Sequence, residues 1–414
     1  MEIVLDKKTI FRLSLVFGLI YFFSTNGLAS LPGITVNFLL KDVLKMSASA
    51  AAYFGAVTII GWVIKPLWGI ISDAFPIFGY RRKSYLILTT LLAAGIWFYL
   101  GQIENYSVGL LLFLFTASAM AYAFNDVVCD GLMVQTGKPQ GLTARFQSIQ
   151  WSSVYTASIL TSLAGGWVAE NWKPQQVFTV NAFFPLIVLI AVLFFVFEEK
   201  TSESREQRMT RWLALKDAAK NKSLWLVAFF LFFWTFSPSF GTPFFYYAVD
   251  NLKFDKVFFG IIGAIGSASS VLGAIFFSRY ANRFETKKLI YWAIILGIIV
   301  TLFDLIYFTP LIVNNLNLAR WISISSAAIL GAVGTFIFLT LLNAAAVICP
   351  RHSEGTTFAA LMSFYNLGQM GSAALGGWLF DQIGLQPLII VSAVFTALTW
   401  FIVPYLKFGE TKTL

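Results

Sequence analysis

Long apolar stretches separated by short polar breaks run along almost the whole chain. A helix that crosses a lipid bilayer needs about 20 mostly apolar residues, and twelve stretches approach or exceed that length. They cover residues 10–40, 48–72, 84–102, 107–135, 143–169, 175–198, 223–250, 256–280, 288–310, 319–349, 354–380 and 386–407. Because several are longer than the minimum, we expect tilted or interrupted helices. The pattern predicts an all-α, polytopic membrane protein with twelve transmembrane helices.

The longest polar stretch, 199–222, falls near the middle of the chain and would form a cytoplasmic loop between two halves. When the first half is shifted by about 211 positions, several residues coincide with residues of the second half. The matches are Pro32 with Pro243, Gly55 with Gly266, Gly165-Gly166-Trp167 with Gly376-Gly377-Trp378, and Glu170 with Asp381. Since each half holds six spans, the copies run in the same direction, as in major facilitator transporters. We predict two pseudo-symmetric six-helix bundles, 1–198 and 223–414.

The first span of each half contains both glycine and proline. The residues are Gly27, Pro32 and Gly33 in the first span, and Pro238, Gly241 and Pro243 in the seventh. Helices broken at corresponding places of two repeats are typical of a transport path. A packing kink is the alternative for any one of these prolines.

The composition agrees with a membrane protein, because 58% of the 414 residues are hydrophobic and only 12% are charged. In a soluble domain about 25% are charged. The formal net charge is +9, but roughly 22 cations fall in loops on one side of the predicted spans and about 6 on the other. Cytoplasmic loops are enriched in Lys and Arg, so the charge predicts orientation rather than nucleic-acid binding. With an even number of spans, both termini would be cytoplasmic.

Few residues are available for metal or redox chemistry. The chain has one histidine, His352, and two cysteines, Cys129 and Cys349, both in apolar stretches. A metal site or a disulfide framework needs more ligands at closer spacing. We therefore expect no metal, no cofactor and no catalytic residue. We expect a monomer whose partners are membrane lipids and a small-molecule substrate.

Six ionisable side chains lie within or at the edge of the predicted spans. Such groups cost about 2.5–3.5 kcal/mol on insertion scales, so they mark function by default. Asp126 and Asp130 are four residues apart on one helix face, which makes the pair a candidate proton carrier. Lys65 and Arg145 could neutralise these carboxylates or bind an anionic substrate. For Asp130 the alternative is a structural partnership with the cytoplasmic arginines, while Asp304 has no obvious partner in the sequence.

Amide side chains and one further carboxylate complete the set of candidates. The candidate substrate-binding amides are Asn125, Gln147 and Gln150 in the first half and Asn366 and Gln369 in the second. Polar amides also join helices to one another, which is the alternative for each. Glu354 begins the eleventh span, where a carboxylate suits the helix dipole. A helix cap is therefore its first interpretation, and a coupling role the second.

The connection between the second and third spans carries a recognisable motif. Gly69-Ile70-Ile71-Ser72-Asp73 is followed by Gly79-Tyr80-Arg81-Arg82-Lys83. It resembles the signature of the major facilitator superfamily, with residues 74–78 inserted before the second glycine. The resemblance implies a gate latch in which Asp73, Arg81 and Arg82 break and re-form contacts as access alternates. A solvated basic loop is the alternative.

Three segments carry a narrower resemblance: Lys65–Tyr85, Asn125–Leu132, and Glu354–Ser363 with Asn366 and Gly368 after it. They are similar to the folate–biopterin transporter family, and the chain resembles its cyanobacterial members. This implies a secondary transporter of folates or pterins, proton-coupled or exchanging, in the inner or plasma membrane of a prokaryote. Lys65 and Arg145 would then hold the carboxylates of a folate. Asp126 would accept hydrogen bonds from pterin nitrogens.

Three other functions remain open at this stage. A major facilitator transporter for another organic anion or aromatic solute would show the same spans. A non-transporting membrane sensor usually needs a soluble output domain, and the central loop is too short for one. A membrane-embedded enzyme needs a catalytic constellation at membrane depth, and the sequence offers no Ser/His/Asp grouping.

Overall fold

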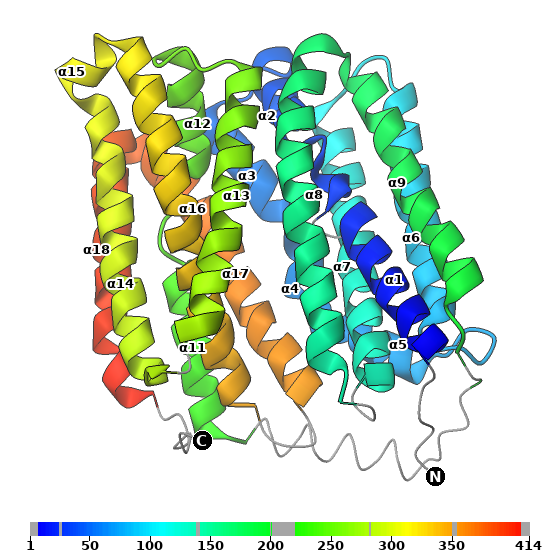
Figure 1. Cartoon of the computed structure of the whole chain (residues 1–414). Coiled ribbons are helices and arrows are strands. Elements are labelled where there is room, and N and C mark those ends of the chain that lie inside the picture. The colour runs from blue at the N-terminus through cyan, green and yellow to red at the C-terminus, as the bar shows by residue number, and fades with distance from the viewer. Residues whose placement is uncertain are drawn as a thin grey trace. The chain divides into compact units, whose positions relative to one another are not determined.

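The computed structural model describes residues 7–24, 27–137, 141–198, 200, 220–280, 283–349 and 354–406, which are almost entirely helical (Figure 1). The elements of the first half are α1 (Lys7–Phe23), η1 (Leu28–Ser30), α2 (Gly33–Phe38), η2 (Leu39–Val43), α3 (Ala48–Thr58), α4 (Ile60–Val63), α5 (Lys65–Ala74), α6 (Lys83–Gln102), α7 (Val108–Gly137), α8 (Thr143–Asn171) and α9 (Pro174–Phe195). Those of the second half are α11 (Lys222–Thr235), α12 (Gly241–Asp250), α13 (Lys256–Tyr280), α14 (Thr286–Phe303), η5 (Asp304–Phe308), α15 (Pro310–Val313), α16 (Leu316–Val347), α17 (Glu354–Ile383), α18 (Leu385–Leu398), η6 (Thr399–Phe401) and η7 (Val403–Tyr405).

Each of the twelve predicted ranges contains helix, which confirms an all-α, multi-pass membrane protein. Within the described residues, nine helical segments are long and apolar enough to cross a membrane. The three ranges that fall outside this set are α8, α11 with α12, and α17. The first and last are rich in Ser, Thr and Gly, and the α11–α12 range is broken in its middle.

The spans that begin each half are interrupted, as the glycines and prolines predict. In the first, α1 ends at Phe23 and α2 begins at Gly33; in the seventh, α11 ends at Thr235 and α12 begins at Gly241. A further break divides the second span, where α3 ends at Thr58 and α5 begins only at Lys65. This break lies just before Pro66, whose ring removes the backbone N–H that a continuous helix needs.

The chain divides into two compact units, and each unit includes a short segment from the other half of the sequence. Unit 1 consists of residues 1–44, 64–203 and 256–264, and unit 2 of 45–63, 204–255 and 265–414. The exchanged segments, 45–63 and 256–264, both open the second span of their half. They begin about 211 positions apart, which is the shift of the sequence repeat.

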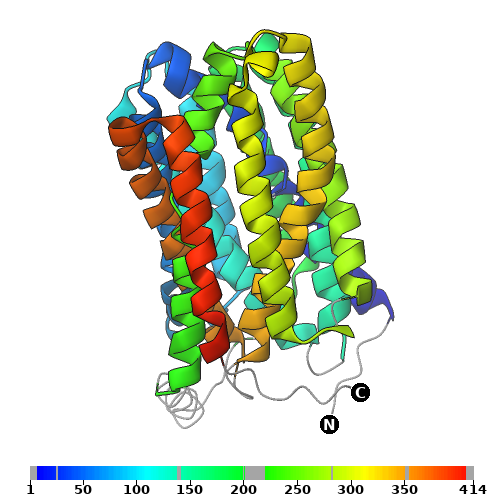
Figure 2. The same cartoon turned by 90° about the vertical axis from the view of Figure 1, so that its left-hand side faces the viewer.

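Buried apolar side chains from several helices form the core of each unit. In unit 1, α6 packs along α9, and α1 packs on α8 and α9 (Figure 1). Fully buried members of that core are Phe17, Leu86, Val128, Phe146 and Val192. In unit 2, α14 packs against both α16 and α18, and α11 packs on α17 (Figure 2). The buried residues there include Phe230, Ile290, Leu341, Leu361 and Val403.

The repeated Gly-Gly-Trp motif marks equivalent close approaches of helices. In unit 1, a Cβ on Gly166 would lie 3.0 Å from the Cα of Gly260 on α13. In unit 2, a Cβ on Gly377 would lie 3.4 Å from the Cα of Ser49 on α3. Positions 166 and 377, and positions 49 and 260, are each separated by the repeat shift. The two copies therefore use glycine for the same reason, which is to bring two backbones together.

Candidate functional site

Lys65 owes its position to the break in the second span. The residue before it, Ile64, has φ −91° and ψ 19°, outside the helical range, and Pro66 lies in the first turn of α5. Proline suits the start of a helix because its fixed φ is already helical and its missing N–H would have no partner there. The Lys65 side chain reaches α7, where its Nζ lies 2.5 Å from Oδ2 of Asp126.

Two carboxylates and one phenol complete what we call the charge cluster: Lys65, Asp126, Asp130 and Tyr21. Asp126 and Asp130 lie one turn apart on α7, and Tyr21 projects from α1. The Tyr21 hydroxyl lies 3.0 Å from Oδ1 of Asp126 and 2.6 Å from Oδ1 of Asp130. Three helices of unit 1 thus meet at these four side chains, and the predicted pairing of the two aspartates on one face is what brings them to one hydroxyl.

The charge cluster is enclosed by apolar residues of the unit 1 core. Only 16% of the Lys65 side chain and 8% of the Asp126 side chain are exposed. Tyr21 belongs to the buried core, and Phe124 and Trp151 pack against that core. Phe124 is stacked on Trp68 of α5, with ring centroids 5.0 Å apart and an interplanar angle of 16°. A charged group enclosed in this way needs polar partners, and the cluster supplies them.

A single hydroxyl faces both carboxylates of the charge cluster. Tyr21 has one O–H, so it can donate to only one carboxylate at a time. Both of its contacts are hydrogen bonds together only when one carboxyl is protonated and donates to the phenol oxygen. Asp126 faces the Lys65 ammonium at 2.5 Å. Asp130 faces the Tyr21 hydroxyl and lies near Gln150.

The other predicted polar residues of the first half lie around the cluster rather than in it. Asn125 is buried and its Nδ2 donates to the Thr89 hydroxyl on α6 at 3.0 Å. Gln150 is also buried, with its Nε2 3.9 Å from the Cys129 sulfur, beside the aspartates. Gln147 and Arg145 are exposed at the start of α8. The structure thus brings Lys65, and not Arg145, onto the aspartates.

In unit 2, Asn366 has a clear structural partner. Because Pro66 lacks an N–H, the Trp62 carbonyl loses the donor that a continuous helix would supply. The Nδ2 of Asn366 on α17 donates to that oxygen at 2.9 Å. A neighbouring helix commonly satisfies the carbonyl freed by a proline in a membrane helix.

The remaining candidates of the second half do not gather at one place. The Nε2 of Gln369 lies 3.4 Å from the Tyr365 hydroxyl, one turn away on α17. Asp304 is half-buried at the first residue of η5, and within the described part of the chain its carboxylate has no hydrogen-bond or ion-pair partner. Glu354 is the first residue of α17, but its side chain lies outside the described residues.

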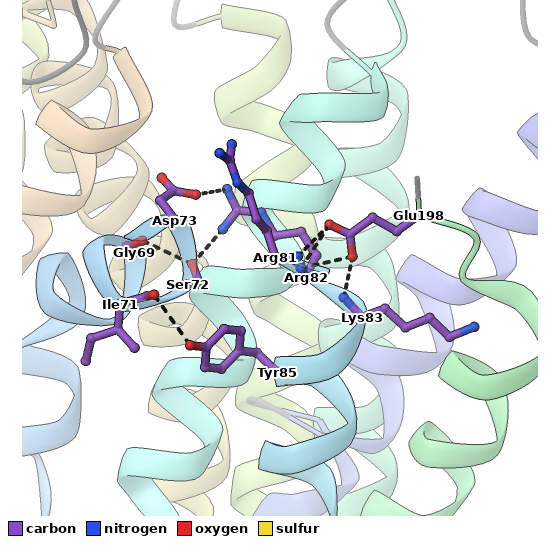
Figure 3. A network of polar contacts seen from close by, with 9 residues as sticks. All are labelled: Gly69, Ile71, Ser72, Asp73, Arg81, Arg82, Lys83, Tyr85 and Glu198. Atoms are coloured by element: carbon purple, nitrogen blue, oxygen red, sulfur yellow. Dashed lines mark hydrogen bonds and ion pairs between the residues drawn. The ribbon is translucent and has the colours of Figure 1, made fainter. Parts of the chain in front are cut away.

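The motif between the second and third spans forms a polar network at one end of unit 1 (Figure 3). Arg82 donates through its two terminal nitrogens, 2.6 Å to Oδ1 of Asp73 and 2.7 Å to the Ser72 hydroxyl. Its guanidinium also lies against Gly131 of α7, where a Cβ would come within 2.7 Å of Cζ. The predicted link between Asp73 and Arg82 is therefore present, and the glycine beside Asp130 leaves room for it.

Glu198 is a member of this network that the sequence did not reveal. Its carboxylate accepts hydrogen bonds from the backbone N–H groups of Arg81, Arg82 and Lys83 at 2.7–3.1 Å (Figure 3). These amides open α6, where the helix dipole favours an anion. Glu198 can reach them because α9 ends at Phe195, before the predicted end of the sixth span at 198, and the chain continues extended. The one signal in the sequence for this role of Glu198 is that an acidic residue directly follows an apolar stretch.

Tyr21 is the other residue of the candidate site that the sequence did not reveal. It lies in an apolar helix and is one of 15 tyrosines, and its partners are 105 and 109 residues away. The available signal was a phenol in a span of the same half as two unexplained carboxylates.

Comparison with known proteins gives consistent matches over nearly the whole chain. A model of the BT1 family matches residues 26–404. The folate-biopterin transporter of Synechocystis sp. is 30% identical over 376 residues, which cover 88% of this chain and 74% of that protein. The probable folate-biopterin transporter 4 of Arabidopsis thaliana is 27% identical over 441 residues, covering 89% and 88%. In structure, a mutant of the nucleoside transporter NupG matches 95% of this chain and 99% of its own with a TM-score of 0.74, at 14% identity.

Proposed function

The chain belongs to the BT1 family, and on that premise we propose that it carries folates or pterins across a membrane by alternating access, coupled to protons. Relatives that bear the name folate-biopterin transporter match most of its length. The likeness to NupG concerns the fold alone. The observation that carries the coupling proposal is the charge cluster of Lys65, Asp126, Asp130 and Tyr21.

The chemistry of the charge cluster suits a folate. The amino-substituted ring of a pterin offers N–H donors, and an ionised carboxylate such as Asp126 accepts them. The glutamate part of a folate carries carboxylates that Lys65 could hold in place of Asp126. When a substrate arrives, Lys65 and Asp126 would each exchange the other for a substrate group. No charge would then be left unpaired in surroundings of low dielectric constant, where an unpaired charge is costly. Trp151 packs on the core that contains Tyr21 and would offer its indole face to the ring, whereas Phe124 already stacks on Trp68.

Proton coupling follows from the same four side chains. If substrate draws Lys65 away from Asp126, the cluster is left with two carboxylates and one phenol. Two carboxylates so close in a desolvated site favour the uptake of a proton. Substrate and proton would then be bound together and released together. In this scheme the network of Asp73, Arg82 and Glu198 acts as the latch. Its contacts break when the carrier changes between its two access states.

Orientation and location complete the proposal. The excess of Lys and Arg lies on the side of the chain that holds Arg81, Arg82 and Lys83. By the positive-inside rule this side, with both termini, faces the cytoplasm, in the inner or plasma membrane of a prokaryote. We propose a monomer as the working unit, since the charge cluster is built from one chain.

The function is tested with purified protein in proteoliposomes. Uptake of radiolabelled folate and of biopterin is measured with an acidic exterior, at equal pH, and with a protonophore. We expect uptake that rises with the inward proton gradient and falls to the equal-pH rate with the protonophore. Counterflow against internal folate separates exchange from symport. Failure to move either compound, together with uptake of another organic anion, would reject the substrate and favour the alternative transporter.

A further inference from the structure

A cavity of about 500 Å³ lies at the end of unit 1 where α6 begins and α9 ends, outside the charge cluster. Its lining residues are Tyr80, Lys83, Phe197 and Glu198. At about 30 Å³ for each water molecule in the liquid, the volume corresponds to roughly 17 waters. It is therefore large enough for a small polar ligand such as a phosphate with an attached alcohol.

Two cations lie near one aromatic ring, that of Phe197, which lines this cavity. The guanidinium carbon of Arg12, from α1, lies 4.2 Å from the centre of the Phe197 ring. The ammonium of Lys83 lies 5.6 Å from the same centre and donates to the Leu193 carbonyl at 3.2 Å. Within the described residues, neither cation has a carboxylate at ion-pair distance. Two neighbouring positive charges that have no carboxylate partner among the described residues form a site that an anion would stabilise.

The one carboxylate that lines the cavity does not neutralise these cations. Glu198 directs its oxygens to the three backbone N–H groups at the start of α6. In Figure 3 the Lys83 side chain extends away from that carboxylate. The stem of Lys200 lies against Gly79, the neighbour of Tyr80, with its Cγ 3.3 Å from where a Cβ would be. The cavity is thus lined by one cation, Lys83, and by a carboxylate that already accepts from backbone amides, while Arg12 lies over the ring of the lining residue Phe197.

The surroundings of the cavity favour a lipid as the source of the anion. Phe197 is 68% exposed, and Phe11 and Phe194, which neighbour Arg12 and Leu193, are each 67% exposed. Such large exposed rings at the ends of membrane helices contact acyl chains and headgroups. A soluble phosphate would gain nothing from them, whereas a phospholipid would contact the rings with its chains and the cations with its phosphate.

We propose that Arg12, Lys83 and Phe197 form a binding site for the phosphate headgroup of an anionic phospholipid. The headgroup enters the cavity between Tyr80 and Phe197, and its phosphate supplies the counter-ion that Arg12 and Lys83 do not have among the described residues. The site belongs to the leaflet that faces the Lys- and Arg-rich side. It does not depend on the transported substrate, so it stands or falls separately from the proposed function.

Native mass spectrometry of the delipidated full chain tests this site with two probes, phosphatidylglycerol and phosphatidylcholine. We expect one phosphatidylglycerol to be retained in preference to phosphatidylcholine. Loss of two cationic contacts in Arg12→Gln/Lys83→Gln should weaken phosphatidylglycerol binding on the order of 30-fold. The matched control is Lys287→Gln, because the Lys287 ammonium also lies at the start of a helix and donates to a carbonyl, that of Pro404, at 3.1 Å. That variant should bind like the wild type.

Equal phosphatidylglycerol retention by the double variant and the wild type would overturn the proposal. Equal retention of the two lipids by the wild type would overturn it as well. Competition with inorganic phosphate separates the two possible sources of the anion. If inorganic phosphate alone binds as tightly as phosphatidylglycerol, the site serves a soluble anion and the lipid assignment is wrong. Should the double variant fold poorly, Arg12→Gln and the charge-conserving Arg12→Lys replace it, and only the first should lose the lipid.

Discussion

The ion pair between Lys65 and Asp126 is the contact whose removal should have the largest effect on stability. At 2.5 Å and an effective dielectric constant of about 20, two unit charges attract by about 7 kcal/mol. Desolvation offsets much of this attraction. Removing one partner of a buried pair still costs about 3–5 kcal/mol, because it leaves the other charge uncompensated. We therefore expect Lys65→Ala to lower the free energy of unfolding by that amount.

A double-mutant cycle isolates the pair from other losses. Lys65→Ala/Asp126→Asn leaves no unpaired charge, so it should cost less than the two single changes together, with a coupling on the order of 2 kcal/mol. The free energy of unfolding is measured in mixed detergent micelles. The control is Lys256→Ala, since Lys256 lies 3.7 Å from Glu170 in the same unit, with side chains 29% and 50% exposed. That surface pair should contribute less than about 1 kcal/mol.

Transport by the same variants tests the proposed role of the pair. Lys65→Ala should raise the apparent half-saturation constant for folate roughly 10-fold or more, because one charge-assisted contact is lost. The constant for biopterin, which has no carboxylates, should change little. Asp126→Asn should abolish uptake of both while the protein is still produced. Additive stabilities in the cycle, together with an unchanged folate constant for Lys65→Ala, would refute the reasoning.

Three further changes test other contacts. The variant Asp130→Asn should still take up substrate, but its uptake should no longer respond to a pH gradient. A retained response in proteoliposomes would mean that another residue carries the proton. Glu198→Ala removes the acceptor for three backbone amides and should cost about 1.5–3 kcal/mol in chemical unfolding, whereas Glu198→Gln, which keeps one acceptor oxygen, should cost less. Asn366→Ala removes the hydrogen bond to the Trp62 carbonyl and should cost about 0.5–1.5 kcal/mol with the folate constant unchanged; a raised constant would mean that Asn366 contributes to the substrate site.

Hydropathy predicted the helical ranges well, because the bilayer fixes the length of a span whatever its neighbours are. It failed where the backbone turns for a local reason. The predicted sixth span ran to 198, but α9 ends at Phe195, since the apolar residues that follow are extended and carry Glu198 to the start of α6. The break before Lys65 likewise depends on a single residue, Pro66. A hydropathy average over the span 48–72 does not reveal a local break of this kind.

Pairing of side chains was only partly accessible from the sequence. The spacing of Asp126 and Asp130 showed that they share a face, but two cations were available and the sequence could not choose between them. The choice of Lys65 over Arg145 depends on how α5 packs on α7, and this is a tertiary fact. Tyr21 lies more than 100 residues from its partners, so no local pattern predicts it.

The charge cluster of the first half has no charged counterpart at the repeat shift in the second half. At the repeat shift, the counterparts of Tyr21, Lys65, Asp126 and Asp130 are Phe232, Phe276, Ile337 and Leu341, and all four are apolar. Phe232 stacks on Phe236 with centroids 5.1 Å apart, and Leu341 lies in the buried core of unit 2. A second set of ions at membrane depth would add about 2.5–3.5 kcal/mol for each ion. The glycine approaches at 166 and 377 are kept in both copies because each half needs them for packing. A carrier that binds one substrate needs the ions in only one half, so the packing is repeated and the charge chemistry is not.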